Sequence, residues 1–325
     1  MLHVEDKRLS LPDGRSLAYA DNGNTSSSTV ILFLHSALSV GDASRPPPVI
    51  LERHLHFVAP SLPGWGNTSP APSPTKYAST VISDITSLLA HLRPKASSKL
   101  KLYICGHSFG TIAAQILYGA PFDSFPYGRC LAGMVLLAPP SPPHCHRAYT
   151  KQLSWASYFL TGPPAHHVPF NITSRLAAYA MRNKLQSPDS AAAFARASYF
   201  DDMDGAEREA LHRWQEARRA PEDQLQRDIA GNMVRSVAKT WRGYLEVPQV
   251  YHSGWGGFDP RRLDDEHAHA GRPVIIVAAR GDKMAPTGAA DWLVANYKNA
   301  SLRLVDGGHL AGFMYLDEVW EELLD

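Results

Sequence analysis

Residues 100–117 constrain the fold of this chain more than any other segment. An apolar run over residues 100–105 ends in Gly106-His-Ser108-Phe-Gly110, and helix-prone sequence over residues 111–117 follows at once. This order predicts a buried strand that turns sharply into a helix. So tight a turn requires residues without bulky side chains two before and two after the serine, and Gly106 and Gly110 meet the requirement. We therefore expect Ser108 at the carboxyl edge of a sheet, with the positive end of a helix behind it.

The rest of the chain predicts the remainder of that sheet. Unbroken apolar runs, typical of strands covered on both faces, occupy residues 30–34, 57–59, 100–105, 134–138, 274–278 and 302–305. Between them, apolar residues recur at helical spacing over residues 77–92 and more loosely over 289–297. An alternating segment over residues 8–20 surrounds Asp13-Gly14 and predicts an antiparallel hairpin. The predicted fold is α/β, with a mostly parallel sheet and helices on both faces.

One long interval interrupts the alternation of strands and helices. Residues 140–272 follow a proline-rich entrance and contain Ala- and Arg-rich helical sequence, such as 174–186 and 206–219, but no comparable strand run. Four tryptophans in the interval argue against a flexible linker, because large aromatic side chains seek packing partners. We expect a helical cap inserted between the core segments 1–139 and 273–325. An independently folded second domain is the alternative.

Composition narrows the possible partners. The 32 basic and 31 acidic residues leave a formal net charge of +1, which gives no electrostatic case for nucleic acid or an anionic membrane surface. The expected partner is a small molecule without strong charge, and the oligomeric state stays open. No secretory signal pattern and no apolar window of the ~20 residues that a membrane span needs is evident, so a cytoplasmic location is expected. Three cysteines fit free thiols: Cys105, Cys130 and Cys145.

The elbow motif and two later segments resemble the α/β-hydrolase fold superfamily over essentially the whole chain except the cap. The family order is serine, acid, histidine. Asp282 follows the apolar run 274–278 and has Pro286 four residues on, as in the family's acid loop; His309 follows the last run in Gly-Gly-His. The resemblance implies Ser108 as nucleophile, His309 as its base and Asp282 as the carboxylate that orients the imidazole. Asp306 is close in sequence to His309 but precedes the glycine turn. Three further acids are less well placed: Asp259, Asp264 and Asp265.

The resemblance also implies the remaining site residues. The backbone N–H groups of Phe109 and Ala37 are expected to form an oxyanion hole. Ser36 departs from the family, which usually has glycine there, so its side chain either narrows the acyl pocket or adds a hydrogen bond to the substrate oxygen. The loop at residues 62–66 also resembles a family loop, in which Ser61 stands where Asp is common. The expected substrate-pocket residues are His35, Ser36, His107 and Trp65.

These features favour a serine hydrolase that cleaves an ester, lactone or thioester with a partly hydrophobic substrate. Serine at the elbow disfavours dehalogenases and epoxide hydrolases, which have aspartate there. Leu310 after the last histidine disfavours hydroxynitrile lyases, which have lysine. Carbon–carbon hydrolysis and aminopeptidase activity are narrower options, and a non-hydrolytic receptor or synthase on the same scaffold is the competing class. No cofactor and no metal are expected. The histidine pairs read as solvated surface side chains: His144/His146, His166/His167 and His267/His269.

Overall fold

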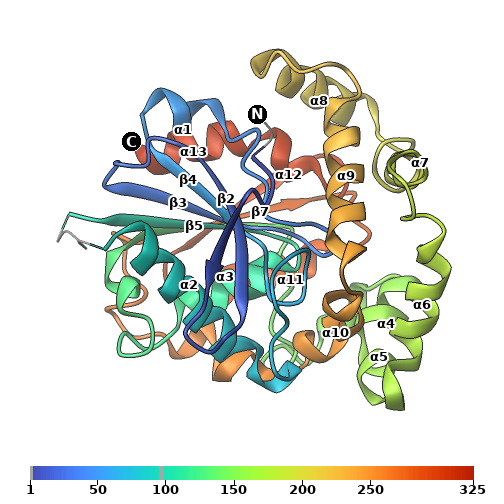
Figure 1. Ribbon diagram of the computed structural model, residues 1–325, viewed down its shortest axis with the longest axis horizontal. Coiled ribbons are helices and arrows are strands. Elements are labelled where there is room, and N and C mark those ends of the chain that lie inside the picture. Colours follow the sequence, from blue (N-terminus) through green and yellow to red (C-terminus); the bar gives the residue numbers. More distant parts are fainter. Residues whose placement is uncertain (1–2, 95–98) are drawn as a thin grey trace.

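An eight-stranded sheet in the order β1-β2-β4-β3-β5-β6-β7-β8 lies at the centre of the structure (Figure 1). The computed structural model describes residues 3–94 and 99–325. The strands are β1 (Lys7–Ser10), β2 (Ser16–Gly23), β3 (Thr29–Leu34), β4 (His56–Pro60), β5 (Lys101–His107), β6 (Leu131–Leu137), β7 (Val274–Ala279) and β8 (Ala300–Val305). The β1–β2 and β2–β4 pairs are antiparallel, and every pair from β4 to β8 is parallel. The mostly parallel sheet and the N-terminal hairpin predicted from the sequence are confirmed.

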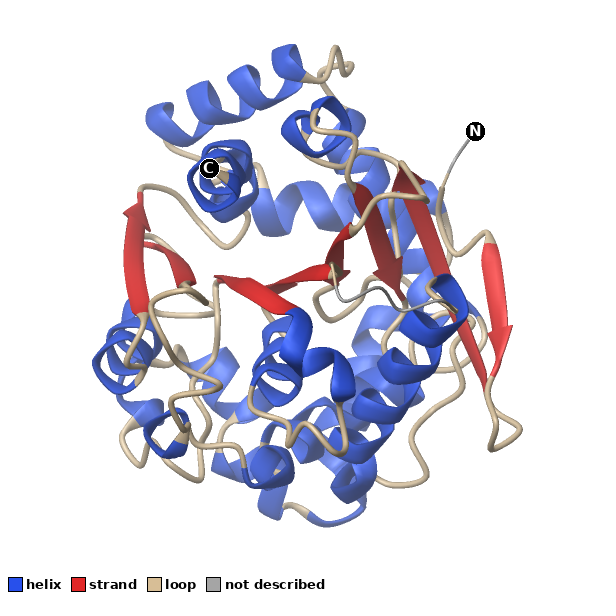
Figure 2. Ribbon diagram, turned by 90° about the vertical axis from the view of Figure 1, so that its left-hand side faces the viewer, coloured by secondary structure: helices blue, strands red, loops and turns tan. Residues whose placement is uncertain are grey.

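Helices cover both faces of the sheet (Figure 2). The helices are α1 (Pro48–Glu52), α2 (Tyr77–Leu92), α3 (Gly110–Tyr118), α4 (Trp155–Thr161), α5 (Pro163–His167), α6 (Ile172–Arg182), α7 (Pro188–Tyr199), α8 (Gly205–Ala217), α9 (Gln224–Ala238), α10 (Arg242–Tyr251), α11 (Thr287–Asn296), α12 (Ala311–Met314) and α13 (Leu316–Leu324). Along a strand, side chains alternate between two hydrophobic clusters. On β7, Val274 and Ile276 belong to the cluster that includes side chains of α2, α3 and α11. Ile275 and Val277 belong to the cluster that includes side chains of α1, α12 and α13. Both faces are therefore buried, which explains the unbroken apolar runs.

The interval between β6 and β7 is helical, and α4 to α9 group on one side of the molecule in Figure 1. The described part of residues 140–272 contains no strand. Helices α7 and α9 form a small hydrophobic cluster of their own, which includes Ala191, Ala195 and Met233. The last part of the interval packs elsewhere, because Trp255 and Phe258 join the cluster of α2 and α3. We call the helices α4 to α10 the helical insertion.

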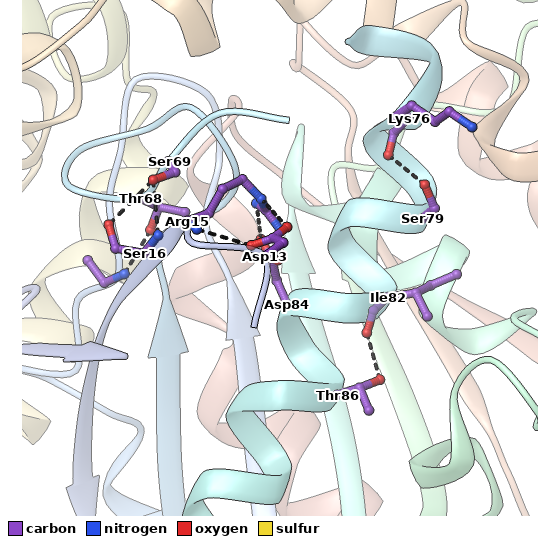
Figure 3. A network of polar contacts seen from close by, with 11 residues as sticks. Asp13, Arg15, Ser16, Thr68, Ser69, Lys76, Ser79, Ile82, Asp84 and Thr86 are labelled. Atoms are coloured by element: carbon purple, nitrogen blue, oxygen red, sulfur yellow. Dashed lines mark hydrogen bonds and ion pairs between the residues drawn. The ribbon is translucent and has the colours of Figure 1, made fainter. Parts of the chain in front are cut away.

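The turn of the N-terminal hairpin is fixed to α2 by an arginine (Figure 3). The Arg15 guanidinium pairs with Asp13 and, with two nitrogens, with the buried Asp84. Burial raises the pKa of Asp84, and the arginine opposes that effect. The hydroxyl of Thr68 accepts the Ala18 N–H at 2.9 Å in the same region. These bonds hold the antiparallel edge of the sheet against its helical layer.

No helix in residues 3–94 or 99–325 combines the length and apolar character that crossing a membrane requires. The three cysteines are free, as expected.

Candidate active site

Ser108 lies on the tight turn between β5 and α3 that the glycine pattern predicts. Its φ is +50°, a left-handed value that a residue with a side chain adopts at a cost of order 1–3 kcal/mol. A Cβ atom on Gly106 would lie 2.8 Å from the Thr111 backbone, and one on Gly110 would lie 2.1 Å from the Leu34 carbonyl oxygen. Only glycine fits at both positions. The Ser108 N–H donates to the Leu137 carbonyl at 2.8 Å, which ties the turn to the end of β6.

Parallel strands bring the other candidate residues to the same edge of the sheet. Ala37 follows β3, Ser108 follows β5, Asp282 follows β7 and His309 follows β8. A cavity of about 660 Å³ opens there, and Ser108, His309 and Ala37 all line it. Side chains from α4, α6, α7 and α10 line its other side, so the cavity lies between the sheet edge and the helical insertion.

His309 and Asp282 are joined by a hydrogen bond of 2.8 Å between Nδ1 of the ring and Oδ2 of the carboxylate. The carboxylate is completely buried, and its other oxygen accepts the N–H groups of Met284 and Ala285 at 2.8 and 2.9 Å. Burial acts to raise the pKa of Asp282, but the charge and hydrogen bond of His309 and the two backbone bonds outweigh it, so the pKa is lowered. Asp282 therefore stays ionised at neutral pH and fixes the proton on Nδ1 of the ring.

Each alternative acid is engaged elsewhere. Asp306 pairs with Arg280 at the surface, at 3.0 Å. The other three make ion pairs away from His309: Asp259 with Arg261, Asp264 with His267 and Asp265 with Lys298. Of the acids that the sequence offers, Asp282 is the one the fold brings to His309.

Phe109 and Ala37, the residues expected to supply two backbone donors, line the same cavity as Ser108. The N–H of Phe109 lies at the start of α3, and that of Ala37 lies in the loop after β3, where Leu38 adopts a φ of +55°. Among described residues, neither N–H donates to another protein group. Both residues line the cavity, as does Ser36. Both N–H groups are therefore free of protein acceptors in the described chain.

The other expected pocket residues lie behind the cavity wall. His35 is buried, with its Nδ1 donating to the Ser36 carbonyl at 2.7 Å and its Nε2 accepting the Leu62 N–H at 2.8 Å. Burial lowers the pKa of His35 to about 4, so the ring is a neutral brace between two loops. Trp65 is buried edge-on against Phe109 and lines neither this cavity nor the smaller one described next.

His107 is buried next to His309. Its Nε2 donates to the His309 carbonyl at 3.2 Å, and burial, assisted by the nearby His309 ring, lowers its pKa to about 3. His107 and His35 line a second cavity of about 160 Å³ beside the first. His107 thus holds the loop of His309 from the sheet side.

Three residues at the site have no signal in the local sequence pattern. Glu207 of α8 accepts the Gly308 N–H at 2.9 Å, and Tyr199 of α7 lies with its ring 6.5 Å from that of His309. Burial, together with the charge of Asp282, raises the pKa of Tyr199 to about 12.

The third such residue, Glu5, supplies a carboxylate where the family commonly has one at position 61. Its Oε1 accepts from Ser61 Oγ at 2.6 Å and from the Asn67 N–H at 2.9 Å, while Ser61 Oγ accepts the Gly41 N–H at 2.8 Å. Only the departure at Ser61 hinted that another group completes this network.

Four of the six paired histidines are exposed, but His146 is half-buried, stacks on Trp292 and lines the cavity, so it is not the solvated side chain that was expected. His267 is buried, which corrects the same expectation. It bonds to Asp264 and to the Ala120 carbonyl and stacks on Phe122. Within the described ranges no group of three or more His, Cys, Asp or Glu side chains is arranged to hold a metal ion.

A serine elbow, a histidine–carboxylate pair and two free N–H groups at the carboxyl edge of this sheet are the features of an α/β-hydrolase fold. The model of the alpha/beta hydrolase family matches residues 31–325, and the chain belongs to that family. Membership places it among hydrolases.

Solved structures agree in fold at low identity. An enol-lactonase from Burkholderia xenovorans LB400 is 13% identical with a TM-score of 0.60, covering 98% of each chain. The esterase RhEst1 from Rhodococcus sp. ECU1013 is 15% identical with a TM-score of 0.58, again covering 98% of each chain. An esterase from Exiguobacterium antarcticum is 15% identical with a TM-score of 0.57, covering 98% of this chain and 96% of that one. No curated protein matches the sequence.

Proposed function

We propose that this protein is a serine hydrolase that cleaves a small, partly hydrophobic ester, lactone or thioester through an acyl-enzyme on Ser108. One observation carries the proposal. Ser108, held at a φ of +50°, lines the same cavity as His309, whose ring is hydrogen-bonded to the buried carboxylate of Asp282. A hydroxyl, an imidazole and a carboxylate in that order are what nucleophilic acyl transfer requires.

In the proposed reaction, Ser108 Oγ attacks the carbonyl carbon while Nε2 of His309 takes the hydroxyl proton. Asp282 keeps the other ring proton on Nδ1, so that Nε2 is free to act as base. In the described chain, Ser108 Oγ and His309 Nε2 make no hydrogen bond to a protein group; catalytic contacts of this kind commonly tighten when substrate binds. His309 then protonates the leaving group, and water releases the acyl group by the reverse route.

The tetrahedral intermediate carries a negative oxygen, and the N–H groups of Phe109 and Ala37 are its proposed donors. The Phe109 donor sits at the positive end of α3, where the helix dipole adds to the attraction. The Ser36 side chain lines the cavity next to these donors.

The size and lining of the cavity support the proposed class of substrate. Its volume of about 660 Å³ lies within the ~300–1,000 Å³ of small-molecule sites. Aromatic and aliphatic side chains dominate the lining, which contains no Asp or Glu and includes Phe194, Tyr199, Tyr244, Val247 and Tyr251. An apolar acyl or ring portion of the substrate suits these walls, and Lys151 and Lys283 are the lysine side chains at the cavity. In this proposal the helical insertion is a cap, formed by residues 140–272 between the core segments 1–139 and 273–325.

A fluorophosphonate probe together with short p-nitrophenyl esters tests the proposal. We expect covalent labelling and ester turnover, both lost in Ser108→Ala and both kept in Ser198→Ala, a matched change of another serine that lines the cavity. If the folded protein neither reacts with the probe nor turns over esters, the receptor or synthase class is the better description.

A further inference from the structure

The outer surface of the helical insertion leaves large apolar side chains in contact with solvent. Most of the exposed large apolar residues of the described chain lie between residues 155 and 179. They are Trp155, Phe159, Leu160, Phe170, Ile172, Leu176 and Tyr179, which we call the insertion apolar face. The exposed fraction is 80% for Trp155, 82% for Phe170 and 76% for Tyr179. Single exposed apolar residues are ordinary, but such a concentration marks an interaction site.

Helix α6 shows that this exposure is directional. Ile172, Leu176 and Tyr179 follow one another at spacings of four and three and all face solvent. The opposite side of the helix buries the small residues Ser174 and Ala178. A helix that served only the core of its own chain would turn the larger apolar side chains inward. The orientation of α6 therefore favours an apolar environment outside the protein.

The neighbouring helix α4 carries Trp155, Phe159 and Leu160 of the insertion apolar face. Helices α4 and α6 are in contact and lie side by side in Figure 1. The Trp155 ring stacks on Phe159 with 6.1 Å between centroids, so the aromatic side chains form a cluster. Tryptophan and phenylalanine are typical of the boundary between lipid headgroups and acyl chains.

The charge of this part of the chain differs from that of the whole. Residues 140–188 contain no Asp or Glu, and their five basic residues are Arg147, Lys151, Arg175, Arg182 and Lys184. All five are exposed, and none forms an ion pair with a carboxylate of the described chain. Arg175 and Arg182 lie on the solvent side of α6 with the apolar stripe. The net charge of +1 for the whole chain gave no reason to expect a membrane partner. That total conceals the local excess of basic residues between residues 140 and 188.

We infer that the insertion apolar face docks on an anionic lipid surface. Apolar and aromatic side chains enter the headgroup region while Arg175 and Arg182 meet the lipid phosphates and carboxylates. A second copy of the chain is disfavoured as the occupant. A two-fold symmetric contact through this face would set its basic residues against their own copies, with no acid from residues 140–188 to pair with them.

Docking in this way also places the cavity next to the lipid. Leu160 of α4 belongs to the insertion apolar face and also lines the cavity; Ser157 of α4 and Met181 of α6 line the cavity as well. The two helices thus separate the cavity from the proposed docking surface. Lipid binding by this face does not depend on the proposed hydrolase activity, and it can be measured without an activity assay.

Vesicle co-sedimentation of the full chain tests the inference. The probes are vesicles of phosphatidylcholine alone and vesicles that also contain phosphatidylserine. We expect the protein to partition onto the anionic vesicles at least about tenfold more strongly and to be released by high salt, because each basic side chain near such a surface contributes roughly fivefold. Equal binding to both compositions, or none to either, overturns the inference.

Paired variants separate the apolar and the electrostatic contributions. Arg175→Glu/Arg182→Glu should weaken binding to anionic vesicles at least about tenfold. Lys76→Glu/Lys101→Glu makes the same change in net charge at exposed positions outside the insertion and should bind nearly as wild type. Trp155→Ser/Phe170→Ser should lose most binding, whereas Leu51→Ser, an exposed apolar control on α1, should keep it. Variants of the face that bind as wild type overturn the inference.

A measurement on the wild-type chain guards against misfolded variants. Lipids brominated near the headgroup should quench part of the tryptophan fluorescence, and Trp155→Phe should remove that part while leaving the thermal midpoint unchanged. Quenching that persists in Trp155→Phe overturns the proposed orientation. Sedimentation velocity without lipid is expected to show no self-association that depends on this face. A dimer that Trp155→Ser/Phe170→Ser dissolves would instead assign the face to a second copy.

Discussion

The Glu207 carboxylate of α8 accepts a 2.9 Å hydrogen bond from the N–H of Gly308, the residue before His309. The contact joins the helical insertion to the loop that carries the candidate base. Gly307 adopts a φ of +111°, and a Cβ atom there would lie 2.7 Å from the carboxyl carbon of Glu207. Glycine at position 307 thus allows the carboxylate to approach the backbone closely. Burial raises the pKa of Glu207, while the Gly308 bond opposes that effect.

Glu207 is therefore expected to position the His309 loop from the insertion. Glu207→Ala should lower kcat/KM for a p-nitrophenyl ester by about fivefold, since a hydrogen bond of this kind contributes about 1 kcal/mol. Glu207→Gln keeps an oxygen acceptor and should restore most of the loss. Glu209→Ala, on the exposed side of the same helix, is the control. An equal loss in the Ala and Gln variants would mean that the charge, and not the hydrogen bond, is what matters.

The pair formed by Asp282 and His309 leads to the second prediction. Asp282→Asn should reduce kcat by about 10⁴, the loss found when the orienting acid of a serine protease is replaced and the imidazole adopts the wrong tautomer. His309→Ala should abolish activity, and both variants should keep the circular dichroism of the wild type. Asp306→Asn is the matched control, because Asp306 pairs with Arg280 at the surface. Near-normal turnover by His309→Ala would show that another residue is the base.

The features of the fold and the site that follow a local sequence pattern could be predicted, whereas contacts between residues far apart in the sequence could not. The strands were predictable because both faces of the sheet are buried, so their sequences are apolar without alternation. The ends of the strands were harder to predict. Strand β5 extends to His107 because Gly106 and His107 pair with β6, although neither residue is an apolar strand former. Ser108, Asp282 and His309 could be proposed from the sequence because each lies shortly after a strand, and parallel strands end at one edge of the sheet.

Glu5 and Glu207 show what a local pattern leaves out. Glu5 bonds to Ser61, 56 residues away, and Glu207 to Gly308, 101 residues away. Neither has a motif around it, and each reads as an ordinary surface acid until tertiary packing encloses it. Ser61 stands where the family commonly has aspartate, but the sequence held no indication that Glu5 bonds to it.

Ser36 tests how the oxyanion hole is built. If the backbone N–H groups of Ala37 and Phe109 are the donors, Ser36→Gly should change kcat by less than about 10²-fold, the lower end of the cost of losing one donor. A change in KM with little change in kcat would show that the side chain limits the acyl pocket. A larger loss in kcat, measured on the same p-nitrophenyl ester, would assign the Ser36 hydroxyl a direct part in stabilising the oxyanion.

The Glu5 and Ser61 network invites a double-mutant cycle. Glu5→Ala leaves the buried donors of Ser61 and Asn67 without their carboxylate and should lower the free energy of unfolding by about 3 kcal/mol. Ser61→Asp alone places two carboxylates together and should also destabilise. Combined, the changes return one carboxylate to the network, so the double variant should be more stable than the sum of the two effects predicts by at least about 1 kcal/mol. Urea denaturation measures the free energy of unfolding of the wild type, the two single variants and the double variant. If the effects of the two single changes simply add, a carboxylate at position 61 does not replace that of Glu5.

Asp21 should make stability depend on acid pH far from the site. Its carboxylate accepts from His56 Nε2 at 3.1 Å and pairs with Lys7, while Arg93 donates to His56 Nδ1 at 2.7 Å. Burial acts to raise the pKa of Asp21, but the bonds from His56 and Lys7 outweigh it and lower the pKa from 3.8 to about 2. Because the folded pKa is the lower one, the ionised group stabilises the fold above pH 3.8 and loses that effect as the pH falls toward 2.

The expected contribution at neutral pH is about 2 kcal/mol, and about half of it should be gone by pH 3. Urea denaturation of the wild type and of Asp21→Asn at a series of pH values measures it. The stability difference between the two should be constant from neutral pH down to about pH 5 and should shrink below that. Asp123→Asn, an exposed acid without an ion pair in the described chain, should show no such trend. A difference between wild type and Asp21→Asn that does not change with pH would mean that the side chain acts through packing, because only the ionised form gains from Lys7.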